Sequence, residues 1–170
     1  LHNGDQAYPA MLAAIRRARR YVYLATYIFD SRGIGREFVA ALAEAQQRGV
    51  QVRVLLDGFG ELYSFPRVGA ALRRAGVEVQ RFLPPRLFPP NFSINLRNHR
   101  KILVVDGSEA FTGGMNLRTK HVSGSEDHPP RVIDVHFHLC GPVVAQIERC
   151  LLSTSPSPRD RTRSRMPSSA

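Results

Sequence analysis

A helical period of apolar residues opens the chain. Within residues 6–19 the hydrophobic side chains recur every three or four positions, and Asp5 stands where an N-cap residue is expected. This spacing predicts a helix over 6–19 whose buried face is formed by Tyr8, Met11, Leu12 and Ile15. A second period over residues 35–48 predicts another amphipathic helix, and Gly49 follows it where a C-cap glycine belongs.

Short apolar runs typical of buried strands lie between and after these helices. Residues 21–29, YVYLATYIF, are aromatic and β-branched, and similar runs occupy residues 50–56 and 77–82. A short helix is predicted over 66–75, between the second and third runs. Alternation of strand and helix predicts an α/β fold with parallel strands and right-handed crossovers.

The pattern changes after residue 82. A proline-rich loop leads to a strand predicted to begin at about His99 and to end at Val105, after which Asp106 and Gly107 supply a hairpin turn and residues 109–112 return antiparallel. The complete sheet is therefore expected to be mixed, mostly parallel and flanked by helices.

A last strand is predicted over residues 132–139, where polar and apolar residues alternate strictly. One face carries Ile133, Val135, Phe137 and Leu139, and we expect it to join the core. The other face, with Asp134, His136 and His138, would then look toward solvent or a cleft. A helix from 142 to about 152 ends the fold, so we assign residues 1–150 to one domain.

Residues 151–170 are rich in Ser, Pro and Arg without an apolar period, which predicts a disordered tail. The formal net charge is +10, and the tail contributes +3 from four arginines and one aspartate, which leaves +7 on residues 1–150. A basic body favours anionic partners, either a polyanion or anionic lipid headgroups. The alternative is an ordinary solvated basic surface.

The residues most suited to chemistry form the pattern H-x-K-x4-D, followed by G-G-x-N. His99 and Lys101 are two apart at the start of a strand, so their side chains point the same way, about 6 to 7 Å apart. An imidazole can attack phosphorus, and an ammonium can hold the non-bridging oxygens of a phosphoryl group. Only two of the 24 basic residues are lysine, so a lysine at 101 is informative. The candidate phosphate-binding residues are Lys101, Gly113, Gly114 and Asn116.

An imidazole nucleophile also needs a carboxylate that fixes its tautomer. Asp106 should point away from the face that carries His99, so we expect Asp134 to orient the imidazole and Asp106 to act as support. The alternatives are that Asp106 only forms the turn, that Asp134 is merely solvated and that His99 is an ordinary surface histidine.

The segment HRKILVVDGSEAFTGGMN resembles the HKD motif of the phospholipase D superfamily, and the segments YIFD, RGVQVRVLLDGFG and DVHFHLCGPVVAQ are similar to bacterial cardiolipin synthases. The resemblance covers residues 1–148 and corresponds to the amino-terminal half of such an enzyme. It implies a phospholipase D-like half domain and a phosphatidyltransferase that needs no metal or other cofactor and works through a phosphohistidine on His99. It also implies a phosphatidylglycerol-like substrate and a place on the cytoplasmic side of the cell membrane, held peripherally or by a segment absent here. The family's usual G-S-x-N serine is replaced by Gly114.

The family reaction uses two HKD motifs, whereas no histidine besides His99 is followed two positions later by lysine. Three interpretations stay open: one half of a synthase whose second half is missing, a homodimeric phosphodiesterase or nuclease, or a half domain without activity. The loop with Leu83, Leu87, Phe88 and Phe92 could receive acyl chains or touch a bilayer, or simply pack on its own domain.

Overall fold

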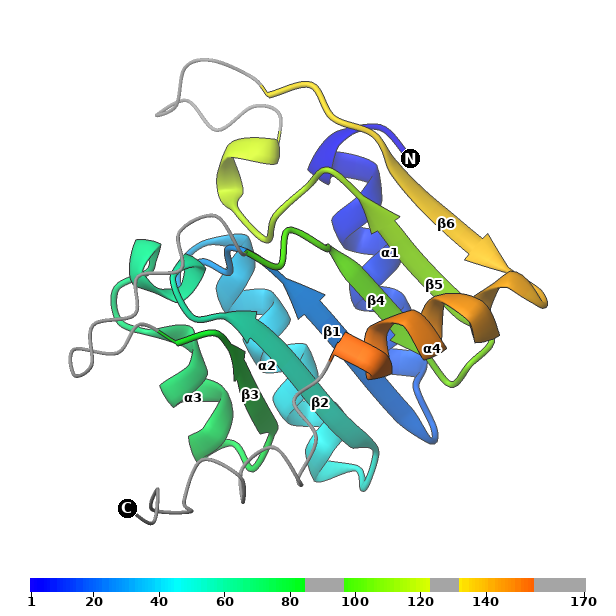
Figure 1. Cartoon of the computed structure of the whole chain (residues 1–170), viewed down its shortest axis with the longest axis horizontal. Helices are drawn as coiled ribbons and strands as arrows, with labels where there is room; N and C mark the ends of the chain where they lie inside the picture. The colour runs from blue at the N-terminus through cyan, green and yellow to red at the C-terminus, as the bar shows by residue number, and fades with distance from the viewer. Residues whose placement is uncertain (85–96, 123–131, 155–170) are drawn as a thin grey trace, which may run out of the picture.

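The computed structural model describes residues 1–84, 97–122 and 132–154, which form a mixed sheet with helices on both faces (Figure 1). In chain order the elements are α1 (Asn3–Arg17), β1 (Tyr21–Thr26), α2 (Ile34–Gln47), β2 (Gln51–Asp57), the 3-10 helix η1 (Gly60–Tyr63), α3 (Val68–Arg74), β3 (Glu78–Phe82), β4 (Ile102–Val105), β5 (Glu109–Gly113), the 3-10 helix η2 (Thr119–His121), β6 (His136–Cys140) and α4 (Val143–Thr154). Every helix and strand predicted from the apolar pattern has its counterpart here, with shifted ends. The strand that was expected to contain His99 and Lys101 begins only at Ile102, so both residues lie in the segment just before β4.

The strand order of the sheet is β3-β2-β1-β4-β5-β6. β1, β2 and β3 are parallel, as the alternation of strand and helix predicted, and β4 then enters antiparallel beside β1. The β4–β5 and β5–β6 pairs are antiparallel as well. The mixed sheet is confirmed: four of the six strands run one way, although three of the five neighbouring pairs are antiparallel.

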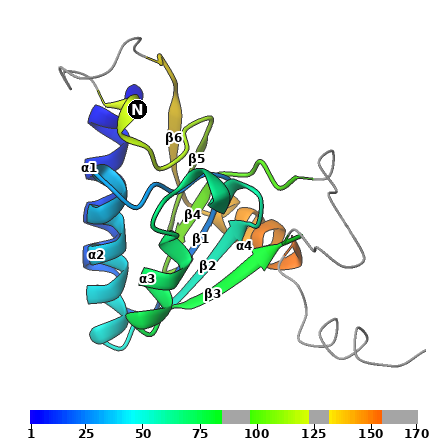
Figure 2. The ribbon, with the colours of Figure 1, turned by 90° about the vertical axis from the view of Figure 1, so that its left-hand side faces the viewer.

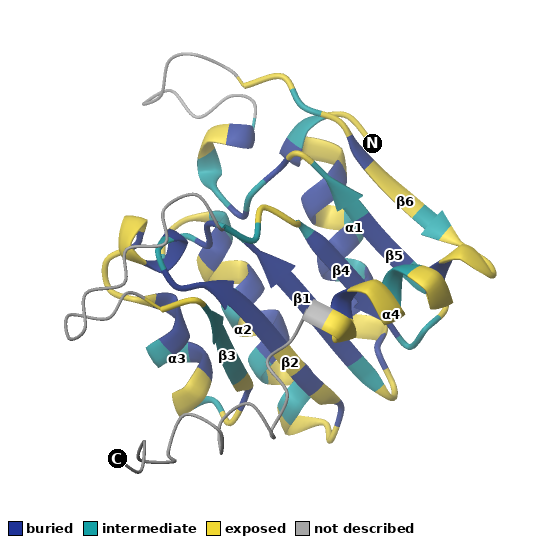
Figure 3. Ribbon diagram, in the orientation of Figure 1, coloured by how far each residue is buried: buried dark blue, intermediate teal, exposed yellow. Residues whose placement is uncertain are grey.

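Two layers of apolar side chains hold the helices to the sheet. On one face α1, α2 and α3 pack on the strands, where Phe38 meets a core that includes Leu24 and Leu103 (Figure 2). On the other face α4 covers a smaller core that joins Val144 to Val104. The central strands are therefore buried along almost their whole length, while the surfaces of α2, α4 and β6 carry the exposed positions (Figure 3).

The predicted orientation of the last strand is wrong. β6 begins at His136 rather than 132, His136 is buried at 2% exposure, and Ile133 and Phe137 are 83% and 57% exposed. Pairing with β5 decides this orientation, because the His138 ring stacks on Phe111, with centroids 4.3 Å apart, on the face covered by α1. The apolar side of β6 lies on the α4 face, where only Leu139 packs against the core.

Two further boundaries differ from the expectation. α1 begins at Asn3 with His2 in the N-cap position, so Asp5 lies inside the first turn and not at the cap. α4 continues to Thr154 and buries Leu151, which contributes about 2 kcal/mol to stability and places the end of the fold beyond residue 150. The rest of the predicted tail, residues 155–170, lies outside the described residues, as do Leu87, Phe88 and Phe92 of the apolar loop.

Candidate functional site

His99 and Lys101 lie where β1 and β2 finish and β4 begins, a region called the site end below (Figure 1). Both pack against Tyr27, which follows β1. The ring centroids of His99 and Tyr27 are 4.4 Å apart, and Lys101 Nζ lies 5.8 Å from the Tyr27 centroid. Lys101 Nζ also donates a hydrogen bond of 2.7 Å to the backbone oxygen of His99. The structure thus brings the imidazole and the ammonium together on one side.

The imidazole of His99 is open to solvent. The residue is exposed, and within the described ranges its ring makes no hydrogen bond or ion pair. The ring lies against the tilted Tyr27 ring, at an interplanar angle of 46°. An imidazole held by a ring face and free at its nitrogens is available to attack a bound electrophile.

Lys101 is half-buried, and this burial lowers the pKa of its ammonium, while the charge of Asp134 works in the opposite direction. Its aliphatic stem lines a small cavity of about 10 Å³ together with Met11, Met115 and His136. Because desolvation disfavours an isolated cation, an arriving phosphate dianion or monoanion would stabilise the charged form of Lys101. The site end therefore favours an anionic ligand.

Asn116 is held beside the same segment. Its Oδ1 accepts a hydrogen bond of 3.0 Å from the backbone N–H of Ile28, and its backbone oxygen accepts one of 2.6 Å from the Tyr8 hydroxyl. With the carbonyl end occupied, the amide NH₂ is the part of this side chain left for a ligand. Burial raises the pKa of Tyr8, so its hydroxyl stays protonated and keeps donating.

Gly113 is the last residue of β5 and Gly114 follows it, opposite the start of β6. Gly113 pairs with His136, and a Cβ at Gly114 would lie 2.6 Å from Oδ1 of Asp134. Replacement of the family's usual serine by Gly114 therefore leaves room for the Asp134 carboxylate. That carboxylate accepts a hydrogen bond of 2.8 Å from the backbone N–H of Val135.

Asp134 was expected to orient His99. The structure places its carboxylate against Gly114 and in the electrostatic field of Lys101, and no contact with the His99 ring is found within the described residues. Lys101 is thus related to both residues, by the charge of Asp134 and by a hydrogen bond to the His99 backbone, and direct orientation of the imidazole by Asp134 stays a prediction.

Asp106 is not brought together with His99. It lies at the other end of β4, where its carboxylate accepts hydrogen bonds of 2.8–2.9 Å from the backbone N–H groups of Arg19, Arg20 and Tyr21. Burial raises the pKa of this carboxyl, but the three donors outweigh it and the net pKa is lowered. Asp106 therefore fastens the α1–β1 turn to the β4–β5 hairpin.

Sequence reasoning missed a second carboxylate at the site end. Asp57 is 1% exposed, and its Oδ1 accepts from the backbone N–H groups of Phe59 and Gly60. Its Oδ2 accepts from Asn98 N at 3.2 Å, and the Arg97 guanidinium lies 3.8 Å away. Asp57 thereby anchors the segment that leads into His99. A polar residue at the carboxyl end of a buried parallel strand was the signal that could have found it.

Two general properties limit the chemistry of the described residues. In that part of the chain no three His, Cys, Asp or Glu side chains are grouped so that they could hold a metal ion. Nor does any helix there have the length and apolar character needed to cross a bilayer.

Comparison with known proteins adds independent evidence. The family described as cardiolipin synthase, PLD-like domain, matches residues 11–134. Cardiolipin synthase B of Salmonella typhi is 41% identical over 149 residues, which is 86% of this chain and 35% of that protein. Cardiolipin synthase B of Escherichia coli K12 is 38% identical over 157 residues, or 92% of this chain and 38% of that protein. The chain thus spans little more than a third of these relatives.

The fold also matches a solved structure. The phospholipase D family member Nuc from Salmonella typhimurium superposes with a TM-score of 0.63 at 18% identity, over 88% of this chain and 89% of that one. At this level of identity the likeness concerns the fold alone.

Proposed function

Because the chain belongs to the family of PLD-like domains of cardiolipin synthases, we propose that it is one half of a phosphatidyltransferase that acts on phospholipid phosphodiesters through a phosphohistidine. The observation that carries the proposal is the convergence of the His99 imidazole and the Lys101 ammonium on Tyr27. This arrangement offers a nucleophile and an oxygen-binding cation to one phosphoryl group.

The proposed reaction has two steps. A nitrogen of His99 forms a bond to phosphorus while the bond from phosphorus to the leaving glycerol oxygen breaks, and a histidine from a second motif gives that oxygen its proton. The incoming hydroxyl then gives its proton to the second histidine and takes the phosphatidyl group from His99. Phosphatidylglycerol is the proposed donor, and a second phosphatidylglycerol, whose headgroup carries free hydroxyls, is the proposed acceptor. Phosphatidylethanolamine has no free hydroxyl and is proposed to take part only as an alternative donor.

The remaining site residues are proposed to serve the charge that grows on the phosphoryl oxygens. Lys101 neutralises it, and the amide of Asn116 and the backbone at Gly113 and Gly114 supply neutral donors. Asp134 is proposed to orient His99 and to favour the charged form of Lys101. Asp106 supports this arrangement from a distance, through the turns that it joins.

The second motif must come from outside this chain, because within its sequence only His99 has the required spacing. The proposed source is the missing second half, since the curated relatives are more than twice as long. A homodimeric phosphodiesterase is the second candidate, supported by the near-complete coverage of Nuc by a domain of this size. We place the protein at the cytoplasmic side of the membrane, and its net charge of +10 fits anionic lipid there.

Labelling with a radiolabelled phosphatidyl donor tests the proposal. Acid-labile label should appear on the parent chain and on the control His2→Ala, and be absent from His99→Ala. Labelling that survives His99→Ala would exclude this nucleophile. A monomeric parent that takes up no label would identify a silent half domain. Label obtained from DNA but not from phosphatidylglycerol vesicles, on a dimeric chain, would favour the phosphodiesterase.

A further inference from the structure

Three apolar side chains project into solvent from η1 and the turn that follows it. Leu62, Tyr63 and Phe65 are 46%, 56% and 84% exposed, and together with Arg67 they are called the 62–67 loop here. Single exposed apolar residues are ordinary, but three within four positions, one of them a phenylalanine almost wholly in solvent, are typical of an interaction surface.

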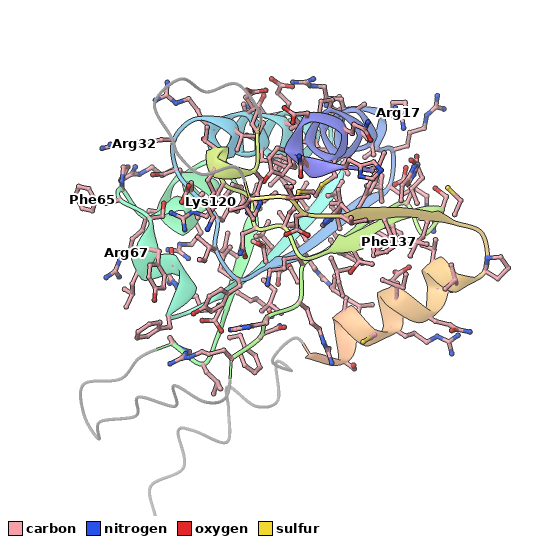
Figure 4. All side chains as sticks on the ribbon, turned by 90° about the horizontal axis from the view of Figure 1, so that it is seen from above. Arg17, Arg32, Phe65, Arg67, Lys120 and Phe137 are labelled. Carbon is pink, nitrogen blue, oxygen red and sulfur yellow. The ribbon has the colours of Figure 1, made fainter. Side chains whose placement is uncertain are left out.

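Unpaired positive charge accompanies these side chains. Arg32 lines a cavity of about 220 Å³ together with Tyr63, Phe65 and the Asp30 that is paired with Arg118, and Arg67 follows two residues after Phe65. Neither arginine makes an ion pair with any described residue, whereas the neighbouring Arg118 is bound to Asp30. Figure 4 shows Arg32, Phe65 and Arg67 projecting from the same side of the molecule, opposite to Phe137.

The 62–67 loop is packed directly onto the site end. The Tyr63 ring meets Phe59 edge-on, with centroids 6.0 Å apart, and the Arg97 guanidinium covers Phe59 at 4.8 Å. A Cβ on Gly60 would overlap the backbone oxygen of Tyr27, so η1 lies in close contact with the residue that supports His99. A ligand bound by the 62–67 loop would therefore lie close to the imidazole of His99, the candidate nucleophile.

We propose that the 62–67 loop, with Arg32, docks the protein on the surface of an anionic phospholipid bilayer. Phe65 and Leu62 would enter the boundary between headgroups and acyl chains, Tyr63 would lie at headgroup level, and Arg32 and Arg67 would bind lipid phosphates. Charge complementarity selects the bilayer over a neutral protein surface, since the free arginines flank the apolar side chains. The inference rests on the proposed function for its choice of lipid, and it adds the surface through which the site reaches the membrane.

Flotation of the full chain with phosphatidylglycerol–phosphatidylcholine vesicles tests the docking surface. Phe65→Ser should reduce vesicle binding roughly tenfold, and Arg32→Ser or Arg67→Ser about fivefold each. The control Phe137→Ser removes an exposed aromatic ring from the opposite side, and Arg19→Ser removes an exposed arginine from the other end of β1; neither should change binding. Equal binding by Phe65→Ser and the parent would overturn the proposal, as would an equal loss in Phe137→Ser.

A spectroscopic readout sharpens this result, because the chain contains no tryptophan. In Phe65→Trp the emission should shift to the blue with anionic vesicles and be quenched by brominated lipid, while Phe137→Trp should show neither effect. If Phe65→Ser instead changed the oligomeric state without changing vesicle binding, the loop would be a protein interface and the proposal would fail. His99→Ala should bind vesicles like the parent, so loss of the proposed chemistry and loss of docking are separate outcomes.

Discussion

The polar side chains at the two ends of β4 differ in how fully they are hydrogen-bonded within the protein. At the hairpin end, the Asp106 carboxylate accepts hydrogen bonds from three backbone N–H groups of the α1–β1 turn. At the site end, the His99 imidazole has no hydrogen-bond partner within the described residues, and Lys101 Nζ is bound only to the backbone oxygen of His99. Four residues of buried strand, Ile102–Val105, separate the two situations.

The difference separates a charge that stabilises the fold from the charge that we propose serves the reaction. A carboxylate whose oxygens are saturated by fixed N–H groups stabilises the fold and has nothing left to offer a ligand. The half-buried ammonium of Lys101 makes one hydrogen bond and can donate further ones to a ligand. Its desolvation also favours an anion beside it. Both ends belong to the same sequence motif. His99 and Lys101 are its proposed binding part, and Asp106 holds the strand that follows them in place.

The largest expected effect is on chemistry, at the site end. Lys101→Met should slow phosphoryl transfer by roughly 10²–10³-fold, because one donor to the developing charge is lost. Single-turnover labelling with the phosphatidyl donor measures this rate, and titration with inorganic phosphate measures the accompanying loss of affinity. Lys120→Met is the matched control, since Lys120 is the other lysine and is exposed. An unchanged rate in Lys101→Met would show that Lys101 does not take part in the transfer reaction.

The next effect is a pH dependence of stability from the buried histidine at the site end. Burial lowers the pKa of His136 from 6.5 to about 4, so the unfolded chain binds a proton in this range and the folded chain does not. Stability should therefore fall as the pH drops from 6.5 toward 4, by on the order of 3 kcal/mol from this group. Urea unfolding at pH 7 and 4.5 measures the loss, and His136→Gln should lose less over the same interval. Equal losses in both chains would contradict the assignment.

A smaller effect is expected at the hairpin end. Asp106→Ala should lower the free energy of unfolding by about 2 kcal/mol, because three hydrogen bonds to a charged group disappear while partly exposed N–H groups regain water. The pKa of Asp106 is lowered in the fold, so its contribution is present at neutral pH and is lost as the pH falls below its ordinary value. The parent and Asp106→Asn should accordingly converge in stability toward acid. Transfer activity at neutral pH, measured where both are folded, should differ little; a loss as large as that of Lys101→Met would erase the distinction between the two ends.

The smallest effect is expected at Gly114. A serine there would bring its Cβ within 2.6 Å of the Asp134 carboxylate, but that carboxylate is the end of a flexible side chain and can turn away. Gly114→Ser should thus change stability by less than about 1 kcal/mol. A double-mutant cycle with Asp134→Asn checks the cause, because the effect of the serine should shrink once the carboxylate charge is gone. Additive effects would show that the two residues do not meet.

Local patterns predicted much of the fold and the centre of the site. Apolar periods located the helices over 6–19 and 35–48 because burial of one face sets a spacing of three to four residues, and both helices are present as α1 and α2. A spacing of two predicted that His99 and Lys101 lie on one side, and both contact Tyr27 although β4 begins only at Ile102. Their contact with Tyr27, however, depends on a strand that lies more than 70 residues earlier.

The orientation of β6 and the partners of the two aspartates were not visible along the chain. Alternation over 132–139 was read correctly, yet which side faces the core depends on pairing with β5 and on how far α4 extends over the sheet. Likewise, the residues next to Asp106 in the sequence do not indicate that it binds N–H groups of a turn 85 residues away.

By itself, then, the sequence determined the elements, the α/β class and the adjacency of imidazole and ammonium, since each follows from the period of one helix or strand. Only the tertiary structure decided that Asp106 binds the α1–β1 turn at the far end of β4 from His99, that Asp57 anchors the approach to His99, and that the apolar side of β6 is exposed. Those outcomes depend on which segments pack together, and packing joins residues that no local period connects.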